Sequence, residues 1–420
     1  MNNLIWHRPK VFYGWCIVAA SVLISTYALG VIASSFTAFI GPLAGEFGWS
    51  HAEISIGASL RGLEGGFFAP LVGFFIDRWD ARKMMLTGVA TVGLGFFLLS
   101  QVNSLWTFYA IFIIIGAGMS TIYPVLPMTV VARWFKSNAA IATGIITSGT
   151  ALAGLMIPLV TRVIDSFGWR MALVIFSIGV WCILLPLALL VRSSPEKYGY
   201  YPDGFVGNKQ DATKKMPKPQ PVESSINIAH VLKSEAFWHV SIAVMLLWLV
   251  ISAVTVHVMP YLSSIGIERS VSSMAASAIP LVSILGRLST GWFGNRIDKR
   301  KVAAVCSFLV GISMFTAGFF YTVASWQLFM LVVLCGVGWG GMVPMQPSLL
   351  GKYFGGSKMG TVLGISISLS AIGMAVGAPV AGWVYDQFES YRYCWLALSA
   401  VAIASGVCVL TGPSIKEGID

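Results

Sequence analysis

Long apolar runs alternate with short polar segments along almost the whole chain. Each run is about 20 residues long, the length that an α-helix needs to cross a bilayer, whereas the strands of a membrane barrel would show alternating segments of about ten residues. The first run follows Arg8 and Lys10, but it is too long for a secretory leader, and eleven more runs follow it. The pattern therefore predicts an all-α polytopic membrane protein with twelve transmembrane helices. The runs lie at 12–39, 53–76, 84–101, 105–132, 139–161, 169–191, 237–262, 271–294, 302–322, 326–350, 359–384 and 393–411.

Composition agrees with this pattern. Hydrophobic residues make up 56% of the 420 residues and charged residues only 10%, against about 45–50% and about 25% in soluble domains. The 44 glycines suit helices that pack closely in lipid. The six cysteines show no paired spacing and the five histidines no metal-ligand spacing. We therefore expect no metal, no cofactor and no enzymatic activity.

The net charge of +10 reflects topology rather than a nucleic-acid partner. Twelve spans put both termini on one side, and 21 of the 27 Lys and Arg residues fall there. Four lie on the opposite side, and two, Arg61 and Arg287, lie inside spans. The positive-inside rule then predicts that both termini are cytoplasmic, in a multi-pass protein of the cell (inner) membrane.

The chain reads as two similar halves. A Pro-rich polar segment, 192–234, is typical of a flexible linker. It separates a six-helix bundle at 1–191 from a second bundle at 235–411, which a short tail at 412–420 follows. Landmarks of the first half recur in the second at a near-constant offset, as Asp77 does at Asn295 and Asp165 at Asp386. Such an internal repeat predicts pseudo-two-fold symmetry and a substrate site near the membrane midplane, between the halves.

A polar cluster follows the second span and has a weaker counterpart after the eighth. It consists of Gly73, Asp77, Arg78, Arg82 and Lys83; the counterpart is Gly291, Asn295 and Arg296. The first cluster resembles the loop motif of the major facilitator superfamily, in which a glycine is followed by Asp-Arg, a second glycine and a basic pair, with Asp80 in place of that second glycine. The resemblance implies the major facilitator fold and a gating role for the loop.

Further segments, in order along the chain, narrow the resemblance. They include Tyr13-Gly14-Trp15, the stretch 42–50, the stretch from His257 to Tyr261, and Arg287-Leu-Ser-Thr-Gly291. Together they resemble the monocarboxylate porters and the bacterial oxalate:formate antiporters. This resemblance implies a small organic anion as the substrate.

Arg287 is the most informative residue. It lies eight positions before Asn295, which places it about 12 Å into a bilayer core about 30 Å thick. A buried arginine is costly, and its guanidinium matches a carboxylate. We therefore interpret Arg287 as a clamp for an anionic substrate. The alternative is a permanent ion pair with Glu64.

Arg61 and Glu64 lie three residues apart on one face of the second span. Glu64 is either a proton-coupling carboxylate or a static partner of Arg61. Monocarboxylate porters commonly carry an aspartate one turn before the clamp arginine, where this chain has Ser283. The proton carrier must then lie elsewhere, or coupling differs.

Four aromatic or amide residues are weaker candidates for binding the substrate. The alternative role for each is packing between helices. They are Tyr27, Tyr123, Trp339 and Gln346, in spans one, four and ten. The resemblance implies that Tyr123 and Trp339 are cavity aromatics. For His257 we expect an interface role or, alternatively, proton handling. The antiporters carry a lysine in span eleven, but 364–370 has none, and a single clamp charge favours a monocarboxylate over oxalate.

These observations predict a monomeric secondary transporter of a small monocarboxylate such as lactate, pyruvate or formate. Its partners would be this anion, a coupling proton and the lipid bilayer. An exporter of drugs or amphipathic metabolites and an oxalate-type anion exchanger stay open as alternatives. A non-transporting sensor is disfavoured by the short tail.

Overall fold

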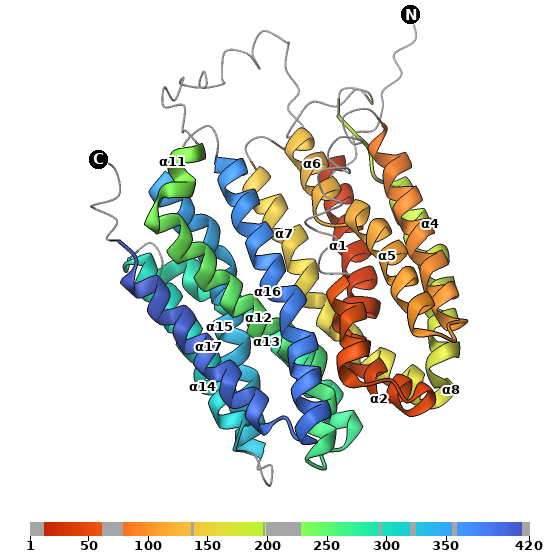
Figure 1. The fold of residues 1–420 in the computed structure, drawn as a ribbon. Coiled ribbons are helices and arrows are strands. Elements are labelled where there is room, and N and C mark those ends of the chain that lie inside the picture. Colours follow the sequence, from red (N-terminus) through yellow and green to blue (C-terminus); the bar gives the residue numbers. More distant parts are fainter. Residues whose placement is uncertain are drawn as a thin grey trace, which may run out of the picture.

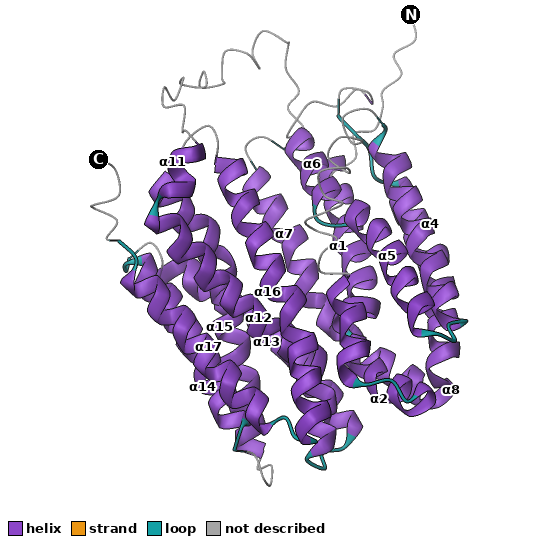
Figure 2. Ribbon diagram, in the orientation of Figure 1, coloured by secondary structure: helices purple, strands orange, loops and turns teal. Residues whose placement is uncertain are grey.

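A computed structural model describes residues 12–60, 79–135, 138–195, 198, 228–293, 296–319, 325–354 and 359–413. Regular secondary structure within these ranges is entirely helical (Figure 2). Nine stretches of the described residues are long and apolar enough to cross a membrane, and the shorter apolar helix Tyr13–Leu29 adds to them. The prediction of an all-α, multi-pass membrane protein is confirmed.

The N-terminal half has described helical residues in each of the first six predicted spans. The helix of the second span starts at His51 and is described as far as Leu60. The labelled elements are α1 (Tyr13–Leu29), α2 (Phe36–Phe47), α4 (Ala81–Ser100), α5 (Leu105–Ile122), α6 (Val125–Trp134), α7 (Ala139–Leu152), α8 (Met156–Gly179) and α9 (Leu185–Leu189).

Two helix boundaries in this half differ from the hydrophobic pattern, and a third lies where the pattern predicted it. The first run, predicted at 12–39, continues through a π-helical turn at Gly30–Ser34 into α2, which ends at Phe47. Gly48 stops α2 because its φ of 66° lies in the left-handed region that glycine adopts without strain. The fourth run is divided at Pro124 into α5 and α6. Gly168, with φ of 77°, separates the fifth and sixth spans inside α8.

The C-terminal half is more regular. Its elements are α11 (Ile228–Lys233), α12 (Glu235–Ser264), α13 (Arg269–Phe293), α14 (Lys299–Ala317), α15 (Ser325–Phe354), α16 (Met359–Phe388) and α17 (Arg392–Thr411). The short helix α11 occupies the end of the predicted linker. Residues 199–227 of the linker lie outside the described residues.

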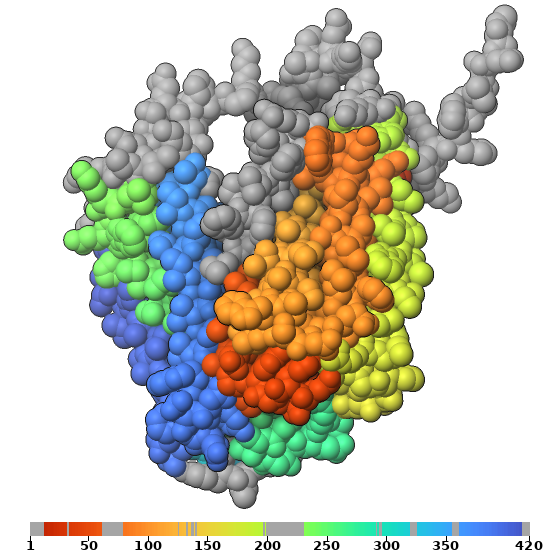
Figure 3. All heavy atoms as spheres, turned by 45° about the vertical axis from the view of Figure 1, so that its right-hand side comes forward, coloured from red at the N-terminus to blue at the C-terminus, as the bar shows by residue number. Residues whose placement is uncertain are grey.

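The start of α1 and the end of α17 lie toward the same end of the molecule, the upper end in Figure 1. We call this the terminal end, and the opposite one the distal end. At the distal end the two halves are in contact: Met259 N of α12 donates to Thr37 Oγ1 of α2 over 3.1 Å. In Figure 3 the red surface of α2 and the segment after it borders the blue of α16 and the teal-green of α13. The described conformation is therefore closed at the distal end.

Glycines set the closest helix contacts, as the composition suggested. A Cβ added to Gly286 of α13 would lie 2.8 Å from Gly341 N of α15, and one added to Gly340 would lie 2.6 Å from the carbonyl carbon of Ser283. Since only glycine leaves room for such an approach, these two helices touch backbone to backbone. This contact fixes the positions of the neighbouring residues Arg287 and Trp339.

Candidate functional site

Arg287 reaches from α13 toward the opposite half of the molecule. Its NH1 donates a 3.3 Å hydrogen bond to the backbone oxygen of Thr147 on α7. Its Nε is buried and has no hydrogen-bond partner within the described parts of the chain. A guanidinium carries five N–H donors, and the acceptor that Arg287 reaches within the described residues is Thr147 O, so this part of the chain leaves donors free for an anion. Tyr123, at the end of α5, is close enough to interact with it electrostatically.

The alternative partner for Arg287 lies outside the described residues. Both Glu64 and Arg61 fall in 61–78, so the structure does not place them. The ion pairs found among the described residues join other groups. Ser283, one turn before Arg287, is buried and donates to Pro280 O over 2.6 Å.

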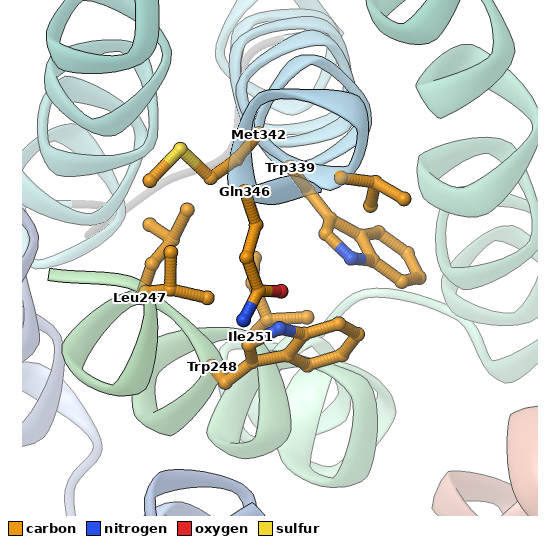
Figure 4. Close-up of a pocket in the computed structure, with 8 residues that line it drawn as sticks. Leu247, Trp248, Ile251, Trp339, Met342 and Gln346 are labelled. Carbon is orange, nitrogen blue, oxygen red and sulfur yellow. The ribbon is translucent and has the colours of Figure 1, made fainter. Parts of the chain in front are cut away.

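A cavity of about 50 Å³ lies between α12 and α15 (Figure 4). Two of the predicted residues, Trp339 and Gln346, line it together with Trp248. The two indole rings meet edge to face, with centroids 6.4 Å apart. Trp339 Nε1 is a buried donor without a partner in the described structure, while Gln346 Nε2 donates to Ser366 Oγ over 3.0 Å. The remaining walls are aliphatic, from Val244, Leu247, Ile251, Met342 and Val343.

Tyr27 lies apart from this cavity. Its hydroxyl donates to Phe176 O over 3.2 Å, and its ring packs against the Phe176 ring at 6.4 Å. Both contacts are within the N-terminal half, on α8. They are the contacts of a residue that packs helices together.

His257 is fully buried where the two halves meet. Its Nε2 lies 2.9 Å from Ala378 O and 3.0 Å from Ser55 Oγ, and its Nδ1 lies 3.0 Å from Tyr391 Oη. Since a carbonyl oxygen can only accept, we assign the proton to Nε2, and Nδ1 accepts from Tyr391. A neutral imidazole satisfies all these contacts.

Part of the loop motif is placed by the structure. Gly73, Asp77, Arg78 and Asn295 lie outside the described residues. Lys83 is exposed, Gly291 lies in the last turns of α13, and the Arg296 guanidinium stacks on Trp292 at 4.0 Å. Arg82 Nε donates to Val191 O over 3.3 Å, so this arginine ties α4 to the end of the sixth span.

Asp80, which departs from the motif, caps a helix. Its Oδ1 accepts from Arg82 N over 2.9 Å at the start of α4, and Asp298 accepts in the same way from Arg300 N over 2.9 Å at the start of α14. The two caps occupy equivalent positions in the repeat, each three residues after Asp77 or Asn295. Burial raises the pKa of Asp298, but its hydrogen bonds with Arg300 outweigh this and hold the pKa below its usual value. Sequence reasoning missed both caps, although an aspartate two residues before an arginine in each repeat was a signal for them.

Comparison with known proteins agrees with this geometry. The family model described as Major Facilitator Superfamily matches residues 16–289 and 258–417. Monocarboxylate transporter 12 of Mus musculus is 24% identical over 95% of this chain and 85% of its own length. Monocarboxylate transporter 13 of Rattus norvegicus is 23% identical over 96% of this chain and 90% of its own length.

Solved structures show the same fold. A bacterial homologue of the human lysosomal transporter Spinster, in an inward-facing and unoccupied conformation, matches with a TM-score of 0.72 at 15% identity. The match covers 96% of this chain and 95% of the other. The family match spans most of the sequence, so the chain belongs to the major facilitator superfamily, and it is a multi-pass membrane transporter rather than an enzyme.

Proposed function

We propose that this transporter moves small monocarboxylate anions by proton-coupled secondary transport, with Arg287 binding the carboxylate. One observation carries the proposal: a half-buried guanidinium on the apolar, membrane-length helix α13 reaches across the two halves, and its buried Nε has no hydrogen-bond partner among the described residues. A buried cation without an anion is unfavourable, and a substrate carboxylate would neutralise it. The relatives named as monocarboxylate transporters support the same substrate class.

The cavity beside α15 suggests the size of the substrate. With Arg287 as the clamp and Tyr123 beside it, Trp339 and Gln346 form the wall that meets the rest of the anion. The wall is mostly apolar and the cavity holds about 50 Å³, room for a methyl or similar group. This favours lactate or pyruvate over formate, which has no carbon beyond its carboxylate. A single clamp charge favours them over oxalate.

The mechanism is alternating access, in which the halves 1–191 and 235–411 rock about the central site. The distal end then faces outward, both termini are cytoplasmic, and the protein functions as a monomer in the cell (inner) membrane. The loop motif around Asp77 and Arg78 stabilises one of the two states. Because Ser283 is not acidic, Glu64 is the carboxylate that we assign to proton coupling.

The test of the clamp is uptake by the purified full-length protein in proteoliposomes. Lactate, pyruvate, formate and oxalate are offered with and without an inward proton gradient. Arg287→Ala should lower lactate or pyruvate uptake at least about tenfold, because hydrogen bonds to charged groups contribute about 1.5–3 kcal/mol. The matched control is Arg162→Ala, since Arg162 is exposed at the distal end. Undiminished uptake by Arg287→Ala would remove the clamp and favour an exporter of amphipathic compounds.

Proton coupling is tested separately with Glu64→Gln. If Glu64 carries the proton, the variant should still exchange external for internal lactate but should no longer accumulate it when a proton gradient is imposed. Gradient-driven accumulation that persists in Glu64→Gln would exclude this residue. Oxalate exchange without any effect of the gradient would instead support an anion exchanger.

A further inference from the structure

Two aspartates at repeat-related positions join the halves at the distal end. Asp165 of α8 accepts a 2.6 Å hydrogen bond from Arg269 Nε, at the start of α13. Asp386 of α16 accepts from His51 N over 3.0 Å and from Ala52 N over 2.9 Å, at the start of the helix that begins there. The helix starts at His51 and Arg269 are also repeat-related, with the same spacing as Asp77 and Asn295. An aspartate of one half therefore meets the start of a helix in the opposite half at both of these repeat-related places.

The chemistry of the two contacts differs. Arg269 is permanently charged, and its side chain and that of Asp165 are 32% and 46% exposed. In the second contact His51 Nδ1 lies 3.2 Å from Asp386 Oδ1, and these side chains are only 20% and 19% exposed. Histidine titrates near neutral pH whereas arginine does not. One contact can thus respond to pH and the other cannot.

The surroundings of His51 disfavour its charged form while the halves are closed. It precedes the predicted span, at the positive end of its helix dipole. The Tyr385 ring of α16 packs on it at 4.5 Å, and the second imidazole, His257 of α12, lies nearby. On the helix of His51 itself, the carboxylate of Glu53 accepts a hydrogen bond from Ser50 N over 2.9 Å. Burial lowers the pKa of His51, and the opposing effect of Asp386 does not restore it to the usual value.

Opening of the distal end would remove this burial. The backbone of α16 lies directly on the start of the His51 helix: a Cβ added to Gly382 would lie 2.7 Å from Ala52 N. The halves cannot separate there without pulling His51 from Asp386 and Tyr385 and exposing it to water. The proton affinity of His51 is then higher in the open state than in the closed one. By linkage, a proton that binds His51 shifts the equilibrium toward the open state.

We propose that the His51–Asp386 contact is an acid-released latch of the distal gate, and that the Arg269–Asp165 contact is its pH-independent counterpart. The latch lets the pH on the distal side set how often the gate opens. This proposal goes beyond the proposed function, because the latch acts on the equilibrium between the open and closed distal gate, whatever substrate the central site binds.

The experiment measures gate opening directly. Spin labels are attached to cysteines placed at Arg162 and Ser263, two exposed positions at the distal end of opposite halves, after the exposed Cys16 and Cys182 are replaced by alanine. Pulsed EPR on the full chain in lipid then reports the distance between the labels at pH 7.5 and pH 5.0. The population of long distances should rise about fivefold or more on acidification, the lower end of typical linked equilibria.

Two variants distinguish this latch from a general effect of acid. His51→Asn keeps a neutral donor near the position of Nδ1 and should abolish the rise, leaving the gate closed at both pH values. Arg269→Gln should raise the open population at both pH values and keep the rise. A rise that survives in His51→Asn, a closure on acidification, or no change in the wild type would each overturn the proposal. No substrate is present, so failure here is separate from failure of the transport assays.

Discussion

At both ends of the molecule, aspartates accept hydrogen bonds from the first residues of helices. These contacts lie within one half at the terminal end and between the two halves at the distal end. At the terminal end, Asp80 and Asp298 cap helices of their own half, and Arg300 NH1 donates to Gly412 O and Pro413 O of that half. At the distal end, Asp386 accepts from the start of a helix in the other half. A capping aspartate within a half stabilises a bundle, whereas one across the halves stabilises a single conformation. The same interaction thus serves folding at one end and gating at the other.

The largest expected effect tests whether distal closure is required for transport. Gly382→Ala adds a Cβ 2.7 Å from Ala52 N and from the carbonyl carbon of His51, both backbone atoms of the other half. Overpacking costs about 1–3 kcal/mol, so the closed state should lose roughly five- to a hundredfold in population. Uptake in proteoliposomes should fall, and the EPR distances at the distal end should lengthen.

The matched control for this variant is Gly364→Ala on the same helix, where an added Cβ would meet no atom of the described residues within 4 Å. It should transport like the wild type. Wild-type uptake and unchanged distances in Gly382→Ala would show that the distal contact is not tight in the working protein.

The sequence predicted the helices well because each span must bury its own backbone in lipid, which leaves long apolar runs. It also predicted that Arg287 lies inside a span, and the structure has this residue in the apolar helix α13, which is long enough to cross a membrane. It did not predict that Asp386 meets His51, because that contact joins residues 335 positions apart in different halves. Nor did it predict the helix break at Pro124, since apolar composition continues through it, or the extension of the first span to Phe47.

Asp80 shows why a motif can mislead. In the family's loop motif, the position of Asp80 is usually a glycine, so the sequence comparison treated this aspartate as a deviation. In the structure it is one of two equivalent caps, and the repeat within this chain was the better guide. Comparison of the halves residue by residue would also have aligned His51 with Arg269, since their spacing is that of Asp77 and Asn295.

A loss of stability of intermediate size is expected when Asp298, which caps α14 at the terminal end, is replaced. Asp298→Ala removes the side-chain acceptor for Arg300 N and should cost about 0.5–2 kcal/mol of stability. Thermal unfolding in detergent should show a lower Tm, with uptake per folded molecule and the distal EPR distances unchanged.

The pH dependence of this cap has a definite sign. The pKa of Asp298 is lowered in the folded protein, so its contribution is present above the pKa of an unfolded aspartate and is lost as pH falls through the folded value. The Tm values of wild type and Asp298→Ala should therefore converge on acidification below about pH 4. A change in distal opening would contradict the separation of folding from gating between the two ends.

The smallest effect comes from an ion pair that lies at the distal end but within one half. Glu46 accepts from Trp169 Nε1 over 2.6 Å and from Arg170 NH2 over 2.8 Å, and all three residues belong to the N-terminal half. The Arg170 hydrogen bond, and after it that of Trp169, lowers the pKa of Glu46. Its contribution is therefore present above the usual glutamate pKa and lost as pH falls below it.

Substitution of this glutamate separates position at the distal end from contact across the halves. Because the pair is exposed and surface ion pairs contribute little, Glu46→Gln should lower the Tm only slightly at pH 7, and this difference should shrink as the pH falls below the usual glutamate pKa. The EPR distances at the distal end should match the wild type at pH 7.5 and keep their response to pH 5.0. A larger open population in Glu46→Gln would mean that position at the distal end, rather than a contact across the halves, is what makes a residue part of the gate.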